Sequence, residues 1–137
     1  MRTQISFELV GPFSHLIIVP ISVNGKGPFS FGLDTGGAHS TISTALAERL
    51  GLEEKEHIES FGVGSSIPLT MSSIESLSLG QATVRDLPVA VADLSAFEQR
   101  LETSIEGILA YDYLKHFILT IDYPHRQLGL EDEHGTP

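Results

Sequence analysis

Short runs of alternating apolar and polar residues, separated by turn residues, limit what this chain can fold into more than any other feature. In the clearest run, residues 17–23, apolar side chains recur at every second position on either side of Pro20. A period of two turns one side of a strand to the core and the other away from it. Similar runs occur at residues 29–33, 67–79, 82–92 and 117–123. The pattern predicts a mainly β fold, either a closed barrel or a pair of packed sheets.

The first two runs are predicted to form a hairpin. The segment Asn24–Pro28 between them is rich in glycine and other turn residues. Pro20 has no amide hydrogen, so its strand is expected to lie at an edge or to be bulged there. The second strand of the hairpin leads directly into Asp34-Thr35-Gly36-Gly37.

Three short segments have features of a helix. Thr44–Leu50 has an apolar side, with Ser43 placed to cap its start and Gly51 placed for a left-handed C-cap. Ser95–Leu101 and Tyr111–His116 are further candidates of one to two turns. One to three short helices are therefore expected in an otherwise β fold.

The length of the chain, 137 residues, fits one domain. We expect that domain to span residues 1–130, with a solvated acidic stretch at 53–59, and residues 131–137 to form a polar C-terminal tail. No apolar run approaches the ~20 residues of a membrane span. No signal peptide is recognisable before the first strand, so a cytoplasmic location is the default expectation. A periplasmic or secreted location is expected instead if a leader is missing from this sequence.

Charge and residue content exclude several classes of function. The chain has 18 acidic and 8 basic side chains, and its net charge of −10 opposes binding to phosphates, so no nucleic-acid partner is expected. Cysteine is absent, which excludes disulfides, thiol nucleophiles and zinc knuckles. The six histidines lack metal-ligand spacing, and the chain has neither a serine-hydrolase elbow nor a phosphate-binding glycine loop. We therefore expect no metal and no cofactor.

Asp34 is the remaining candidate for acid–base chemistry. It follows the apolar end of a predicted strand, and Gly36 and Gly37 after it let the backbone turn tightly and approach a ligand. Thr35 adds a hydroxyl that can lock the loop through a hydrogen bond. A surface turn would explain the same residues, so the tripeptide Asp-Thr-Gly is only suggestive by itself.

Four segments follow one another in an order that is informative as a set. The loop Asp34-Thr35-Gly36-Gly37-Ala38 is followed by the predicted helix at 44–50, by small residues at Gly62-Val63-Gly64, and by Gly107–Leu114. This order, with the strand through Tyr123-Pro124, resembles the retroviral-type (retropepsin-like) aspartic proteases, most closely their bacterial single-domain branch. The resemblance covers residues 16–130 and implies a closed β-barrel, the acid-protease fold, with the Asp-Thr-Gly loop at the floor of a cleft.

The resemblance also implies a mechanism and an assembly. In such enzymes two aspartates share a proton; one activates a water molecule and the other protonates the scissile carbonyl oxygen, with no metal or organic cofactor. Only Asp34 is followed by Thr-Gly in this chain. A two-lobed monomer is therefore excluded, and an active protease requires a homodimer in which the two copies of Asp34 meet on a two-fold axis. Thr35 of one subunit would grip the loop of the other.

Two more segments receive roles from the resemblance. Gly62, Val63 and Gly64 would lie in a flap, within residues 61–66, that closes over the substrate. Ile108, Leu109 and Ala110 would pack behind the catalytic loop. The family normally has glycine at the third of these positions, and the extra methyl group of Ala110 is expected to have a modest effect on activity.

The leading hypothesis is a homodimeric aspartic endopeptidase that acts on polypeptide substrates. Two alternatives stay open. The first is a non-catalytic dimerisation or peptide-binding module on the same fold, which Ala110 and the plain small flap favour. The second is an unrelated β-barrel carrier of small apolar ligands, which would be a monomer with a closed internal cavity.

Overall fold

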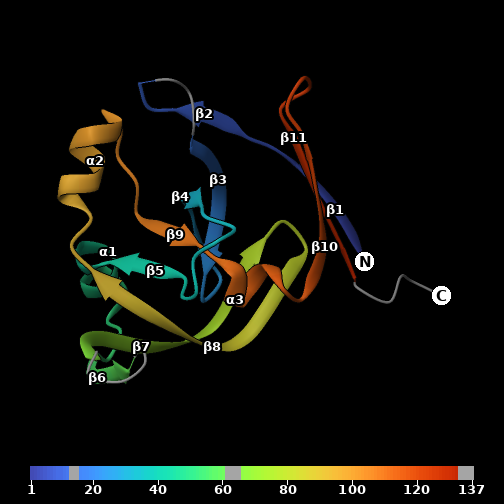
Figure 1. Ribbon diagram of the computed structural model, residues 1–137. Helices are drawn as coiled ribbons and strands as arrows, with labels where there is room; N and C mark the ends of the chain where they lie inside the picture. Colours follow the sequence, from blue (N-terminus) through green and yellow to red (C-terminus); the bar gives the residue numbers. More distant parts are fainter. Residues whose placement is uncertain (13–15, 61–65, 133–137) are drawn as a thin grey trace.

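A closed barrel of six strands forms the centre of the molecule (Figure 1). The computed structural model describes residues 1–12, 16–60 and 66–132. The barrel strands are β3 (Leu16–Val23), β4 (Lys26–Leu33), β5 (Thr41–Ser43), β7 (Ser66–Leu79), β8 (Ala82–Ala92) and β9 (Gly107–Leu109). They follow one another in the order β3-β4-β9-β5-β8-β7, and β7 pairs with β3 to close the barrel. The predicted mainly β fold is confirmed, in its barrel form.

The predicted hairpin is also confirmed, as β3 and β4. Pro20 lies opposite Ser30 of β4. On its other side β3 pairs with β2 (Glu8–Val10) only up to Ile18, and with β7 only from Ser22. Pro20 therefore occupies a stretch with a neighbour on one side, next to a bulge between Ile21 and Val23. This is the local edge that a residue without an amide hydrogen needs.

Strands β2, β5 and β9 are absent from the sequence-based prediction, and so is a fourth strand at the edge of the barrel sheet. This strand, β6 (Lys55–Ser60), pairs on one side only, with β7, and extends the barrel sheet. Residues 53–57 are exposed, as expected for an acidic solvated stretch. Because charged side chains dominate residues 53–57, this edge strand shows no apolar alternation and its pairing is invisible in the pattern.

A separate three-stranded antiparallel sheet brings the two ends of the chain together. Its order is β1-β11-β10, and its strands are β1 (Arg2–Ser6), β10 (Phe117–Asp122) and β11 (Gln127–Asp132). Leu128 and Leu130 of the central strand are fully buried in the main core. The strand β11 includes Glu131 and Asp132, the first two residues of the predicted polar tail. Residues 133–137 lie outside the described part of the chain.

The three predicted helices are present. The first, α1 (Thr44–Leu50), has the predicted bounds: the Leu46 amide donates to Ser43 Oγ, and Gly51 adopts φ 66° at the C-terminal end. The other two are α2 (Ser95–Leu101) and α3 (Tyr111–Leu114). The last is two residues shorter than the predicted segment Tyr111–His116. No helix in the described residues is long and apolar enough to cross a membrane.

Tyr113 fixes α3 against the barrel. Its ring is fully buried, and its hydroxyl donates to the Ala82 carbonyl oxygen at 2.6 Å and accepts from the Leu79 amide at 3.2 Å. Burial raises the pKa of Tyr113, which keeps the hydroxyl protonated as a donor. Since Leu79 and Ala82 flank the turn between β7 and β8, this one side chain joins that turn to the segment that follows β9.

Candidate active site

Asp34 lies where β4 leaves the barrel. The strand pairs in parallel with β9, which places Leu33 beside Leu109, and the Asp34 amide donates to the Leu109 carbonyl oxygen at 2.8 Å. The Asp34 side chain is exposed. Figure 1 shows the loop between β4 and β5 in front of the barrel, next to α3. The barrel register therefore fixes the position of a carboxylate that remains accessible.

The loop after Asp34 is a tight turn. The Gly37 amide donates to the Asp34 carbonyl oxygen at 3.2 Å, and the Gly36 amide donates to Asp34 Oδ1 at 3.2 Å. A Cβ on Gly37 would lie 2.9 Å from Asp34 Oδ2 and 3.3 Å from the Ala110 Cβ. A side chain at residue 37 would therefore displace the Asp34 carboxylate from this position, since real Cβ atoms do not approach so closely. Thr35 and Gly36 are exposed beside it.

The segment Ile108-Leu109-Ala110 lies directly behind this loop. Leu109 and Ala110 are fully buried, whereas Ile108 is partly exposed and packs with a second, smaller apolar cluster. The Ala110 methyl group faces Gly37, which has no Cβ, so there is room for it. The site thus accommodates alanine at this position in full burial.

Ser40 and Asp112 hold the far end of the loop, and neither is predicted from the sequence to belong to the site. Ser40 Oγ donates to Asp112 Oδ1 at 2.6 Å, and the Ser40 amide donates to Asp112 Oδ2 at 2.9 Å. The same Oγ accepts from the Ala110 amide at 2.9 Å, and Asp112 Oδ1 also accepts from the Tyr113 amide. One carboxylate therefore ties the end of the Asp34 loop to the start of α3.

The remaining predicted residues and titratable groups add no second site. Gly62, Val63 and Gly64, the expected flap residues, lie outside the described part of the chain. Within residues 1–12, 16–60 and 66–132, no group of three His, Asp or Glu side chains is arranged to hold a metal ion. The candidate site is therefore a single carboxylate on a braced glycine turn.

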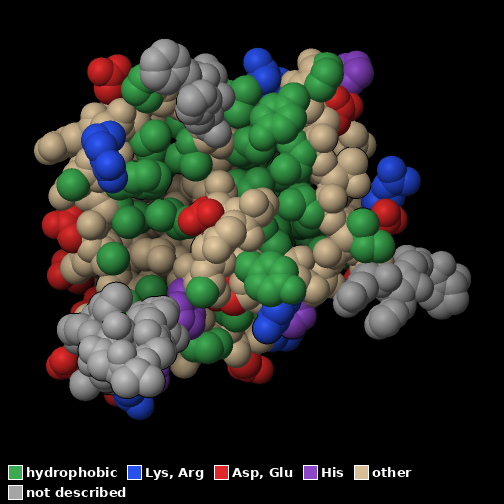
Figure 2. Space-filling view, in the orientation of Figure 1, with side chains coloured by type: hydrophobic (Ala, Val, Ile, Leu, Met, Phe, Trp, Pro, Cys, Tyr) green, Lys and Arg blue, Asp and Glu red, His purple; other side chains and the backbone are tan. Residues whose placement is uncertain are grey.

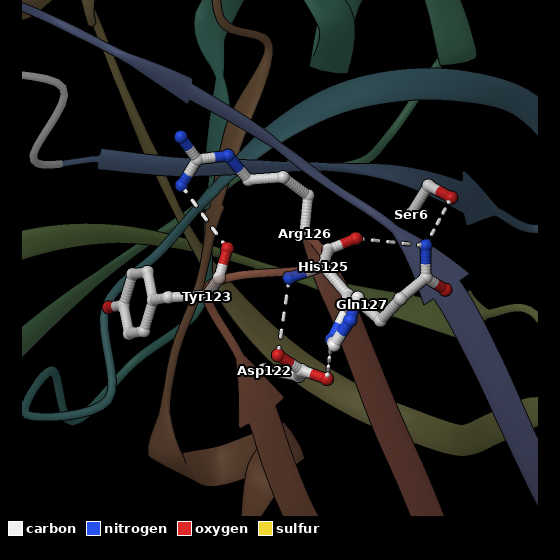
Figure 3. A network of polar contacts seen from close by, with 6 residues as sticks. All are labelled: Ser6, Asp122, Tyr123, His125, Arg126 and Gln127. Atoms are coloured by element: carbon white, nitrogen blue, oxygen red, sulfur yellow. Dashed lines mark hydrogen bonds and ion pairs between the residues drawn. The ribbon is translucent and has the colours of Figure 1, made fainter.

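An Asp–His pair lies elsewhere, in the turn between β10 and β11 (Figure 3). His125 Nδ1 lies 2.8 Å from Asp122 Oδ2, and the His125 amide donates to Asp122 Oδ1. Hydrogen bonds from the His125 side chain and amide lower the pKa of Asp122. Gln127 Nε2 donates to Ser6 Oγ beside it, which links the turn to β1. We interpret these contacts as a network that stabilises the turn.

Comparison with known proteins places this geometry in context. A family model described as aspartyl protease matches residues 19–113, which include the Asp34 loop and Ala110. The chain is similar to a retropepsin-like aspartic protease from Rickettsia conorii, with 17% identity, a TM-score of 0.66, and coverage of 95% of this chain and 91% of that one. It is also similar to the retroviral protease-like domain of Ddi1 from Leishmania major, with 20% identity, a TM-score of 0.53, and coverage of 85% and 88%. No curated protein matches the chain. The two solved structures confirm the predicted retropepsin-like fold.

Proposed function

The chain belongs to the aspartyl protease family, and we propose that it is an endopeptidase that hydrolyses polypeptides with two Asp34 carboxylates, one from each subunit of a homodimer. The observation that carries this proposal is the exposed Asp34 carboxylate on its braced turn at the end of β4. An accessible acid in a fixed position is what a hydrolytic centre needs. The membership of the family supports the choice of peptide bonds as the substrate.

The homodimer follows from the number of carboxylates that the reaction uses. Hydrolysis by this route requires a base and an acid at the same bond, and the sequence holds one Asp-Thr-Gly loop. A two-fold axis beside Asp34 supplies the second carboxylate from an identical loop. The exposure of Asp34, Thr35 and Gly36 leaves this part of the loop open to a second copy.

The reaction then proceeds without a metal or organic cofactor. One Asp34 carboxylate takes a proton from a water molecule as the water oxygen bonds to the scissile carbonyl carbon. The partner's Asp34 gives its proton to the carbonyl oxygen, which yields a tetrahedral diol. The first Asp34 then passes its proton to the leaving nitrogen as the carbon–nitrogen bond breaks. One diol hydroxyl gives its proton to the partner's Asp34, so a carboxylic acid is released and the pair again holds one proton. We propose that Thr35 contacts the loop of the partner and that Gly62, Val63 and Gly64 belong to a closing flap.

The rigid surroundings of the loop support this assignment. The Asp34 amide is fixed by Leu109, and the loop end is fixed by Ser40 and Asp112. Such bonds keep the carboxylate in place before substrate arrives, so little reorganisation is needed during the reaction. Because the methyl group of Ala110 fits against Gly37, this position gives no reason to prefer a non-catalytic module. The main apolar core occupies the barrel interior. This packing gives no support to the alternative of a carrier that holds apolar ligands in an internal cavity.

The proposal is tested by comparing Asp34→Asn with the wild-type protein on an unfolded polypeptide at mildly acidic pH. We expect wild-type cleavage and a loss of at least ~100-fold in the variant, since neither base nor acid chemistry is possible with an amide. Asp93→Asn is a matched control, because Asp93 is an exposed carboxylate in the segment before α2, bonded to the Ser95 amide. Equal cleavage by wild type and Asp34→Asn would end the proposal. Peptide binding without turnover in both would indicate a non-catalytic module.

A further inference from the structure

Three large hydrophobic side chains stand out on the surface of the described residues. Tyr111 is 58% exposed, Tyr123 is 49% exposed and Ile118 is 44% exposed. Of these, only Tyr111 is bonded to the candidate site: its amide donates to the Gly37 carbonyl oxygen at 3.0 Å. An exposed aromatic ring is thus attached to the same turn that carries Asp34.

The face around this turn has the character of an interaction surface. Figure 1 places the β4–β5 loop and α3 on the side turned to the viewer. On that side, Figure 2 shows mostly hydrophobic and uncharged surface around one acidic side chain near the middle, with the other charged side chains mainly along the rim. Protein interfaces have the same arrangement, with few charges at the centre and a polar rim. In a chain of net charge −10, a face of low charge is where two copies meet with least repulsion.

A two-fold axis at the proposed pair of Asp34 carboxylates would bring Tyr111 inside the contact. Two carboxylates that share a proton lie ~3 Å apart, so the axis passes beside Asp34. A stable interface buries ~800 Å² on each partner, which corresponds to a disc with a radius of about 16 Å. Gly37 is three residues from Asp34, so even an extended chain would keep the bonded Tyr111 amide within about 14 Å. The tight turn brings it closer still.

We propose that Tyr111 is the aromatic anchor of the homodimer, with its ring buried against the second copy of the chain beside the two Asp34 loops. This inference rests on the proposed function, because it needs the axis to pass next to Asp34. Tyrosine is among the residues that contribute most at interface centres, since it buries a large rigid ring and can keep its hydroxyl hydrated or bonded. The Asp34 loop would then serve both catalysis and dimerisation, and the neighbouring Tyr111 ring would stabilise the dimer.

The chain offers a matched control. Tyr123 has a similar exposure, but it lies in the turn between β10 and β11. Its ring packs edge-on against Phe7, with 5.9 Å between the ring centroids. We expect Tyr111→Ser to raise the dimer dissociation constant at least ~20-fold in sedimentation experiments, and Tyr123→Ser to change it less than ~3-fold. Peptidase activity of Tyr111→Ser should fall at low protein concentration and return at high concentration. A variant that is damaged in chemistry rather than association would not recover in this way.

A second variant keeps the test decisive if Tyr111→Ser does not fold. The sequence contains no tryptophan, so Tyr111→Trp introduces a single tryptophan, which can be excited selectively, at the proposed contact. Its emission should shift to shorter wavelength over the concentration range in which the mass doubles. Emission that stays constant while dimers form would overturn the inference, as would a Tyr111→Ser protein that dimerises like wild type. Both results leave the proposed function intact if the wild-type dimer is active; a wild-type protein that is monomeric and inactive at every concentration would refute the proposed function itself.

Discussion

Ser40 holds the far end of the Asp34 loop through its hydroxyl and its amide. It is fully buried, and its hydroxyl lies between Asp112 Oδ1 and the Ala110 amide. In Ser40→Ala the buried Ala110 amide loses its acceptor and Asp112 loses a donor. We expect a loss of ~1–3 kcal/mol in the free energy of unfolding, measured by chemical denaturation. Ser78→Ala is the control, because the Ser78 hydroxyl pairs with Thr83 at the surface; equal losses in both variants would contradict this role for Ser40.

The sequence predicts one half of this site and not the other. Asp34 and its glycines are adjacent in the chain, so the turn and its chemistry can be inferred locally. Ser40 and Asp112 are 72 residues apart and have no characteristic spacing. They meet only because β9 pairs in parallel with β4 and Tyr113 fixes α3 against the barrel. An acidic residue at the start of a short helix is explained equally well by the helix dipole. The sequence therefore gives no sign that Asp112 also binds Ser40.

The turn between β10 and β11 is an element whose stability should depend on pH. Hydrogen bonds from His125 lower the pKa of Asp122 below its ordinary value of ~3.9. The Asp122 carboxylate therefore contributes stability that is fully present above about pH 4 and is lost as the pH falls through its lowered pKa. In Asp122→Asn this contribution is missing at every pH.

Thermal unfolding across the acidic range provides the measurement. The difference in Tm between wild type and Asp122→Asn should be largest above about pH 4 and should shrink toward lower pH. His125→Ala removes the ring that bonds Asp122. The Tm of this variant should therefore fall less than the wild-type Tm as the pH is lowered below about 4. Parallel curves for wild type and Asp122→Asn, with a constant difference down to the lowest pH, would show that the carboxylate is not responsible.

Elements differed in how well the sequence predicted them. The bounds of α1 are correct because its caps, Ser43 and Gly51, act on neighbouring backbone groups. The hairpin of β3 and β4 is correct because alternation and turn residues are local too. In contrast, β5, β6 and β9 contain three to six residues each, and only their pairing with neighbouring strands identifies them as strands. The three residues of β5 and of β9 are too few positions for a period to show, and β6 is missed because it lacks apolar alternation.

In the whole molecule, the net charge of −10 opposes the assembly that the proposed function requires. Two identical acidic subunits repel, and the proposed contact is a mainly hydrophobic face with most of its charges at the rim. Screening should therefore strengthen the dimer. The Debye length falls from ~30 Å at 0.01 M salt to ~8 Å at 0.15 M, so repulsion between charges outside the contact should weaken markedly over this range.

We expect the dimer dissociation constant at neutral pH to fall several-fold between ~0.01 M and ~0.15 M salt, as measured by sedimentation. Peptidase activity at low protein concentration should rise in parallel. The sequence has an isoelectric point of about 4.8, and near that pH the same change in salt should have little effect on association, because the subunits no longer repel. A dimer that weakens as salt is added at neutral pH would instead be held by ion pairs across the interface, which is incompatible with a mainly hydrophobic contact around Asp34 and Tyr111.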